Sequence, residues 1–121
     1  MNFLWVTINV KDMEESLNFY QEILGLKLNR KLNPLPGTEI AFLGNGGTEV
    51  ELIRNVQNGK PQYGNDISMG FSVKSLDEEI KRLKKTGVKD IQGPFQPNPT
   101  IKFIYITDPN GVKIQLVESA T

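Results

Sequence analysis

The sequence contains neither cysteine nor histidine among its 121 residues. Without cysteine there is no disulfide framework, and nothing in the composition speaks against a reducing cytoplasm. Without histidine the chain lacks the commonest protein ligand of zinc, nickel and iron. A tight transition-metal site in this chain would therefore depend on carboxylates and amides alone.

The sequence also lacks an excess of either charge and any long apolar run. Its 14 basic and 14 acidic residues cancel, whereas a nucleic-acid-binding surface needs a basic excess or stripe. No apolar run approaches the roughly 20 residues of a membrane span. The opening MNFLWVTINVKD has no basic region and no cleavage site typical of a signal peptide. We therefore expect a cytoplasmic protein of one domain, with neither nucleic acid nor membrane as a partner.

What the sequence does contain is a repeat. The stretch VKDMEESL at 10–17 returns in outline as VKSLDEEI at 73–80. An extended segment precedes each copy, and a glycine that can end a helix follows each, Gly25 and Gly87. Such self-similarity at one long offset indicates two copies of one supersecondary unit.

Each copy is predicted to run strand, helix and then three strands. The fold class is therefore α+β, with two βαβββ modules in one domain over residues 1–54 and 66–118, joined by a linker at 55–65 that contains Gly, Asn and Pro. The later strands are predicted at Leu26–Lys31, Glu39–Leu43 and Thr48–Arg54 in the first copy, and at Lys89–Gln92, Ile101–Thr107 and Val112–Glu118 in the second.

Capping signals place both helices. Asp12 with Glu15, and Ser75 with Glu78, have the spacing of a capping box. The apolar stripes predicted to face the core are Leu17, Tyr20, Ile23 and Leu24 in the first helix, and Leu76, Ile80 and Leu83 in the second. Between the last two strands, Asp108-Pro109-Asn110-Gly111 predicts a hairpin turn, in which Asn-Gly tolerates positive φ at both positions.

Alternation along the strands separates two faces of each sheet. Leu4, Val6, Ile8 and Val10 are predicted to lie beneath the helix, as are their counterparts Ile67, Met69, Phe71 and Val73. The opposite faces are mixed, with aromatic and polar side chains together. Two such faces turned toward each other would enclose a cavity suited to a small molecule. The alternative is that these side chains simply pack a barrel interior.

The segments VTINVKDMEESLNFYQEILGLKL and YITDPNGVKIQLVE resemble the opening and closing motifs of the vicinal oxygen chelate superfamily. This superfamily includes glyoxalases, bleomycin-resistance proteins, fosfomycin-resistance enzymes and extradiol dioxygenases. The resemblance covers nearly the whole chain and implies paired βαβββ modules. Because small members commonly pair, it also implies a homodimer.

The resemblance implies metal positions as well, and these match Trp5, Glu51, Ser68 and Gln115. The metalloenzymes of the family usually carry His or Glu there, and only Glu51 conforms. Trp5 cannot be a ligand, while Ser68 and Gln115 are weak neutral donors. We therefore expect no bound metal and no cofactor.

Three functions remain as hypotheses. The first is a metal-independent protein that binds a small aromatic or amphipathic molecule between its sheets, as in the sequestering bleomycin-resistance branch, although this chain lacks the acidity of the true bleomycin binders. The second is a glyoxalase I-like lyase or isomerase with an atypical site. The third is a structural or regulatory module. The ligand-binding residues expected for the first are Trp5, Thr7, Phe42, Glu51, Ser68, Phe103, Tyr105 and Gln115.

Glu51 is the one candidate general base for an enzyme, because it is predicted to lie beside Trp5 in a partly dry cavity. To stabilise the resulting anion, Lys113 is predicted to lie on the same face, and Tyr105 could donate a hydrogen bond. The alternative interpretation is structural: Glu51 would accept hydrogen bonds from Ser68 or Gln115 and hold the two sheets in register.

Overall fold

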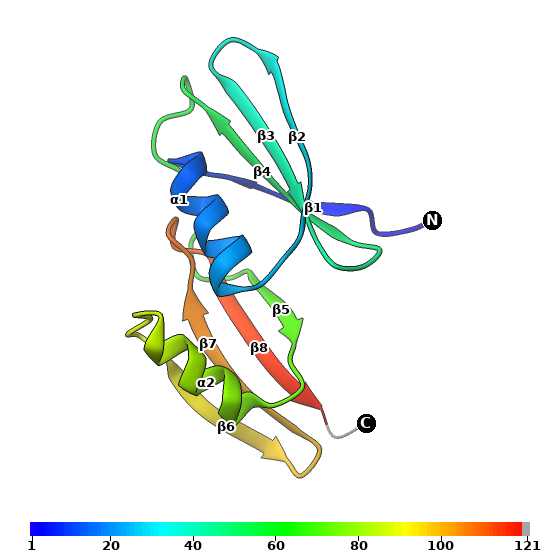
Figure 1. Ribbon diagram of the computed structural model, residues 1–121, viewed down its shortest axis with the longest axis vertical. Coiled ribbons are helices and arrows are strands. Elements are labelled where there is room, and N and C mark those ends of the chain that lie inside the picture. Colours follow the sequence, from blue (N-terminus) through cyan, green and yellow to red (C-terminus); the bar gives the residue numbers. More distant parts are fainter. Residues whose placement is uncertain (120–121) are drawn as a thin grey trace. The chain divides into compact units, whose positions relative to one another are not determined.

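The computed structural model describes residues 1–119, and Figure 1 shows a helix against a sheet in each half of the chain. Contacts within the chain define two units, of which the first ends at Gln62 and the second begins at Tyr63. Each unit runs strand, helix and three strands, so the predicted α+β class with two βαβββ modules is confirmed.

The first unit contains β1 (Trp5–Asn9), α1 (Met13–Asn18) with a π-helical turn directly after it (Phe19–Ile23), β2 (Leu28–Leu35), β3 (Thr38–Leu43) and β4 (Glu49–Asn55). The second contains β5 (Ser68–Ser72), α2 (Leu76–Lys85), β6 (Gln92–Asn98), β7 (Ile101–Thr107) and β8 (Lys113–Ser119). The strand orders are β1-β4-β3-β2 and β5-β8-β7-β6. In each sheet the first strand pairs in parallel with the last, and the other pairs are antiparallel.

The first helix begins where its cap was predicted. The Asp12 carboxylate accepts a hydrogen bond from the Glu15 amide at 2.9 Å, and Gly25 ends the helical segment with φ +71°. The π-helical turn was not expected. It widens the last turn, so that Phe19 and Tyr20 are both buried, whereas the predicted stripe had only Tyr20 of this pair.

The second helix follows its prediction more closely. The Ser75 hydroxyl accepts from the Glu78 amide at 3.3 Å. A second cap comes from the sheet, because the Glu118 carboxylate accepts from the Leu76 amide at 2.7 Å. Leu76 and Leu83 are fully buried, and α2 contacts β7 and β8. One face of the second sheet is thus covered, as Figure 1 shows.

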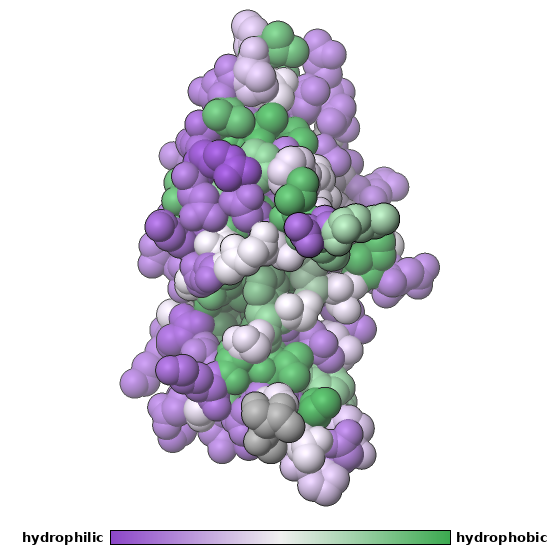
Figure 2. Space-filling view, turned by 90° about the vertical axis from the view of Figure 1, so that its right-hand side faces the viewer, coloured by the Kyte–Doolittle hydropathy of each residue, from purple (hydrophilic) through white to green (hydrophobic). Residues whose placement is uncertain are grey.

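The core of each unit lies between its helix and its sheet. Its strand side chains include Ile8, Leu52, Ile104, Ile114 and Leu116, all buried. Leu4 and Ile67 were predicted to lie beneath the helices, and this is wrong: both are exposed, because each precedes the first strand of its sheet. Further large apolar side chains stay exposed in both units, and the face drawn in Figure 2 shows apolar groups among polar ones over each.

Two strands differ from their predicted bounds by more than one residue. β2 extends to Leu35, four residues past the predicted end, and β6 covers Gln92–Asn98, whereas Lys89–Gln92 was predicted. Both added stretches contain proline and have irregular pairing. Both strands lie at the outer edge of their sheets, where a residue without an amide hydrogen is tolerated.

The predicted β7–β8 hairpin forms, with a different turn geometry. Gly111 has φ +96°, but no non-glycine residue of the described chain has positive φ, Asn110 included. The Asp108 carboxylate closes the turn instead, since its Oδ1 accepts from the amides of Asn110 and Val112 at 2.8 Å each. Within residues 1–119 no helix is long and apolar enough to cross a membrane.

Candidate functional site

The open face of the first sheet has a buried carboxylate at its centre. Glu51 on β4 lies between Thr7 on β1 and Phe42 on β3 in the strand register. The Thr7 hydroxyl donates a hydrogen bond of 2.5 Å to Glu51 Oε1. Glu51 is only 8 % exposed. A carboxylate removed from water in this way needs its hydrogen bond, because an unpaired buried charge is costly.

The neighbouring carboxylate on the same face is fully engaged. Glu49 accepts two hydrogen bonds from the Arg30 guanidinium, at 2.9 and 3.3 Å, and a third from the Asn29 amide at 3.0 Å. The Asn29 hydrogen bond has the largest effect on the pKa of Glu49 and lowers it. Burial opposes this, and the Arg30 hydrogen bond and the Arg30 charge lower the pKa further. Glu49 is thus paired with Arg30, whereas no ion pair to Glu51 occurs within residues 1–119.

Arg30 also fixes the aromatic side chains of the face. Its guanidinium lies 4.0 Å from the centroid of the Phe42 ring. Phe42 in turn meets Trp5 edge to face, with centroids 5.1 Å apart and planes at 70°. Trp5 stays 41 % exposed. The indole is therefore supported on one side and accessible on another, as a stacking surface for a planar molecule requires.

On the second sheet the open face centres on Tyr105. The Gln115 side-chain amide donates to the Tyr105 hydroxyl at 3.4 Å. The Lys113 ammonium lies 4.1 Å from the centroid of the Tyr105 ring. Phe103 is 5.5 Å from Tyr105, centroid to centroid. Ser68 is exposed and lies opposite Lys113 in the strand register.

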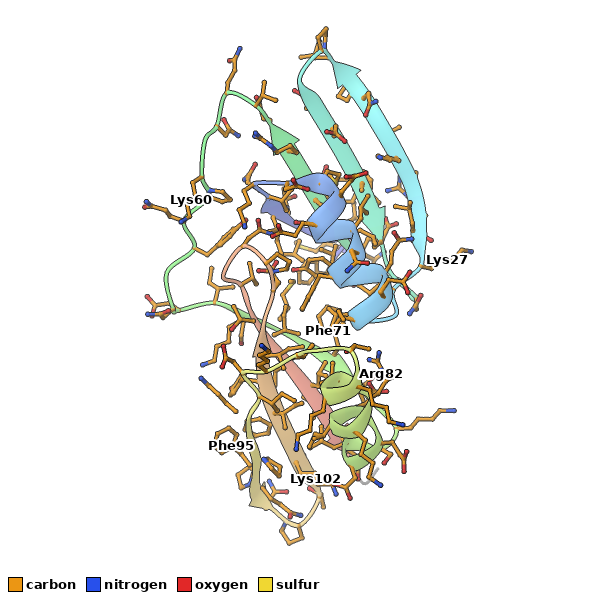
Figure 3. All side chains as sticks on the ribbon, turned by 60° about the vertical axis from the view of Figure 1, so that its left-hand side comes forward. Lys27, Lys60, Phe71, Arg82, Phe95 and Lys102 are labelled. Carbon is orange, nitrogen blue, oxygen red and sulfur yellow. The ribbon has the colours of Figure 1, made fainter. Side chains whose placement is uncertain are left out.

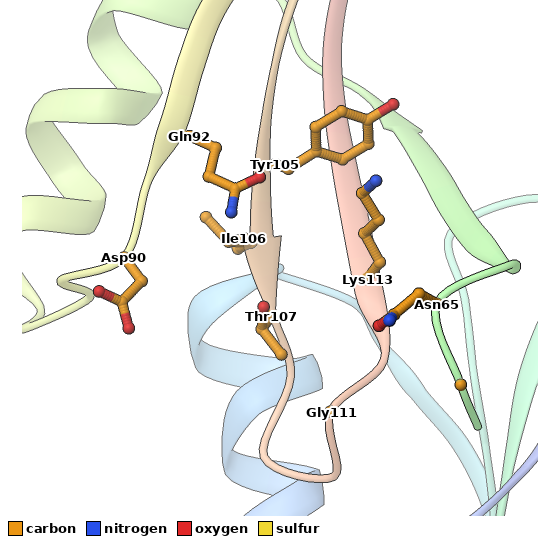
Figure 4. A pocket seen from close by; sticks show the side chains of 9 residues that line it. Asn65, Asp90, Gln92, Tyr105, Ile106, Thr107, Gly111 and Lys113 are labelled. Atoms are coloured by element: carbon orange, nitrogen blue, oxygen red, sulfur yellow. The ribbon is translucent and has the colours of Figure 1, made fainter. Parts of the chain in front are cut away.

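Two hollows adjoin Tyr105 on this second unit. One, of about 240 Å³, is mainly polar. Figure 4 shows Asp90 on one side of β7 and Lys113 on the other, with Gln92 between them and the Tyr105 ring next to the Lys113 ammonium. The other, of about 580 Å³, is lined by Pro94, Phe95, Gln96, Pro97, Phe103 and Tyr105. Figure 3 shows Phe95 on the side of the second sheet away from α2.

The structure thus brings together Trp5, Thr7, Phe42 and Glu51 on one predicted face, and Phe103, Tyr105 and Gln115 on the other. The sequence prediction missed Arg30 and Phe95. Arg30 lies on a strand whose faces had not been assigned, and Phe95 lies between two prolines outside any predicted strand. The acidic alternation of β4 indicates a basic partner nearby, but no local pattern selects Arg30 over its neighbour Lys31.

Comparison with known proteins identifies the chain. Residues 2–116 match the model of the Glyoxalase/Bleomycin resistance protein/Dioxygenase superfamily. The chain belongs to this superfamily. The lactoylglutathione lyase of Salmonella typhimurium is 33 % identical over 98 % of this chain and 93 % of its own length.

Solved structures of other proteins share the fold. A glyoxalase family protein from Bacillus cereus superposes with a TM-score of 0.81 at 21 % identity, over 100 % of this chain and 95 % of its own. An antibiotic-binding protein from Streptomyces sp. CB03234 superposes with a TM-score of 0.80 at 21 % identity, over 98 % and 96 %. At these identities the similarity establishes the fold alone.

The residues at the superfamily's metal positions do not fit a transition metal. The indole of Trp5 offers no lone pair to an ion, because its nitrogen is a donor only. Ser68 and Gln115 offer only neutral oxygen donors, and Glu51 is the single carboxylate at these positions. Among residues 1–119 no three His, Cys, Asp or Glu side chains gather where they could hold an ion. Zinc, nickel and iron sites need about three such donors.

Proposed function

We propose that this protein binds a small aromatic or amphipathic molecule without a metal ion, in the manner of a sequestering protein. The observation that carries the proposal is the group on the first sheet, where a buried carboxylate lies next to a supported, half-exposed indole. Such a surface is organised before any ligand arrives, which reduces the entropy lost on binding.

The roles of the side chains follow from their contacts. Trp5 stacks on the planar part of the ligand, and Phe42 forms a second wall. Glu51, held by Thr7, receives a hydrogen-bond donor or a cationic group. A cation over the indole gains about 1 kcal/mol at such a half-exposed site, or roughly fivefold in affinity. On the second sheet, Ser68, Phe103, Tyr105 and Gln115 are further proposed ligand contacts.

Fluorescence titration tests this function, because Trp5 is the only tryptophan in the sequence. A panel of planar cations, neutral analogues and anions is titrated, with calorimetry in parallel. We expect at least one compound to quench or shift Trp5 emission. We also expect Glu51→Gln to weaken the binding of the cations more than the binding of the neutral analogues. Compounds that bind by calorimetry without changing the emission would place the site elsewhere. A panel in which nothing binds would favour the structural module.

A metal titration and elemental analysis test the metal-independent part. We expect the purified protein to carry no stoichiometric divalent metal, and Trp5 emission to respond to the ligand equally with and without EDTA. About one nickel, zinc or iron per chain, bound at Glu51 and lost in Glu51→Ala, would contradict the proposal.

The second candidate is a lyase or isomerase with Glu51 as general base. It is favoured by the 33 % identity to a protein named lactoylglutathione lyase and by the position of Glu51 in a nearly dry site. Lactoylglutathione lyase activity that appears in the wild type and disappears in Glu51→Gln would support it. We further propose that the protein is a homodimer, as small members of the superfamily commonly are, which light scattering on the purified protein measures directly.

A further inference from the structure

We infer that the open face of the second sheet binds an aromatic group that carries an anion, with Lys113 holding the anion and Phe95 and Phe103 holding the ring. This builds on the proposed function, since it takes the open sheet faces as binding surfaces. It adds the chemical class of the ligand group and two residues, Lys113 and Phe95, that the expected ligand set did not contain.

The ring site is the shallow, open hollow of about 580 Å³ lined by the aromatic rings and prolines of β6 and β7. Phe95 and Phe103 have centroids 5.5 Å apart and planes at 42°, and Phe95 lies 6.2 Å from Tyr105. Phe95 is 44 % exposed. Its ring is thus free to cover a ligand, while Phe103 and the flanking prolines restrict where that ligand can lie.

The anion site is the adjoining hollow of about 240 Å³, which shares Tyr105 with the first. Lys113 is half-buried and contacts the Tyr105 ring. No ion pair with it occurs within residues 1–119. Two other cations of this unit are already paired: Arg82 with Glu79 at 2.8 Å, and Lys102 with Asp77 and Glu118 at 3.9 Å each. Lys113 can therefore offer its charge to a ligand.

The surroundings of Lys113 also determine the direction of the ligand. Gln92, Asn65 and Thr107 line the same hollow with hydrogen-bonding groups. Asp90 lies on the other side of β7 from Lys113 (Figure 4) and would repel an anion there. Because the ring face of Tyr105 already holds the Lys113 ammonium, a cationic ligand is disfavoured at this point. The anion is thus placed beside Lys113 and the ring beyond Tyr105.

The test is a titration of the ¹⁵N-labelled full chain with 2-naphthoate, and with neutral 2-naphthalenemethanol as the matched ligand, followed by amide NMR. We expect shift changes concentrated in β6, β7 and β8, and 2-naphthoate to bind about fivefold tighter, as expected for one solvent-screened ion pair. Raising the salt concentration should reduce this preference.

Substitutions test which side chain holds the anion and which holds the ring. Lys113→Gln should abolish the preference for 2-naphthoate without weakening the alcohol, while Lys113→Arg should keep it. Lys102→Gln, at a cation already paired, is the control and should change nothing. Phe95→Ala should lower the affinity for both ligands to a similar degree. The amide spectrum of each variant reports whether it is folded.

Three results would overturn the inference: equal affinity for the two ligands, a preference that survives Lys113→Gln in a folded protein, or no shift changes in β6–β8. If the ligands perturb β1, β3 and β4 with Trp5 emission instead, the inference fails while the proposed function stands. If they perturb β6–β8 alone and no compound affects Trp5, the inference stands and the role of Trp5 fails.

Discussion

The hydrogen bond from Thr7 to Glu51 can be tested by a substitution that keeps the shape of the side chain. Thr7→Val retains a β-branched residue in β1, so strand propensity is preserved. It removes the donor of a carboxylate that is 8 % exposed. Leaving such a group unsatisfied costs about 1–3 kcal/mol. We therefore expect the free energy of unfolding to fall by about 2 kcal/mol, which lowers the urea midpoint by roughly 1 M at a typical slope.

A second substitution separates this cause from general damage. Glu51→Met removes the carboxylate at similar length, so that no unsatisfied charge remains. When both hydrogen-bonding partners are replaced by apolar groups the change can be nearly neutral. The double variant Thr7→Val/Glu51→Met should thus be more stable than Thr7→Val alone, and the two single variants with the wild type complete the double-mutant cycle.

Chemical denaturation followed by circular dichroism measures all four proteins of this cycle. Thr107→Val is the matched control, because Thr107 is an exposed strand threonine at the end of β7, and surface substitutions usually change stability by under about 0.5 kcal/mol. If Thr7→Val is as stable as the control, or if adding Glu51→Met destabilises it further, the Thr7 hydroxyl does not compensate a buried charge and the argument for Glu51 as a prepared ligand anchor loses its basis.

Three further predictions concern packing, backbone and pH. Leu52→Ala, at a fully buried side chain, should lower the free energy of unfolding by about 2–5 kcal/mol, whereas Leu35→Ala, at a 66 % exposed one, should change it little; equal losses would contradict the assignment of the core. Gly93→Ala should cost at least about 1–2 kcal/mol in the same denaturation assay, because φ there is +109° and a Cβ would lie 3.1 Å from a backbone oxygen; an unchanged midpoint would refute this. The pKa of Glu49 is lowered from 4.5, so its hydrogen bonds stabilise the fold above pH 4.5 and this contribution disappears as the pH falls through the lowered pKa. Glu49→Gln should therefore lose less stability on acidification than the wild type does. Identical pH profiles of the free energy of unfolding would count against this prediction.

Much of the fold could be predicted because its signals are local. The capping residues act within one helical turn, and their hydrogen bonds appear at Asp12 and Ser75 as expected. The alternation of β4 and β8 is equally local, since successive side chains of any strand point to opposite faces. The repeat then required only that both copies fold alike, and their strand orders agree.

The errors arose where distant parts of the unit decide. Whether Leu4 is buried depends on how far the helix extends over the sheet, which no local pattern contains. The position of β6 depends on its place at the edge of the sheet, because only an edge strand tolerates the prolines that it contains. The contact between Arg30 and Glu49 links two strands that are not neighbours in the sheet, so that period-two alternation could place Glu49 on its face but could not provide its partner.

The prolines of the edge strands have a consequence for association between molecules. An exposed edge normally presents a row of amide and carbonyl groups that can recruit a strand from another chain. β2 contains Pro34, β6 contains Pro94 and Pro97, and both strands pair irregularly, so neither offers a continuous ladder to an incoming strand. The opposite edges, β1 and β5, contain no proline. Among the four edge strands, β1 and β5 are therefore the ones in which proline does not interrupt the row of amide donors, and a proline introduced there would interrupt it.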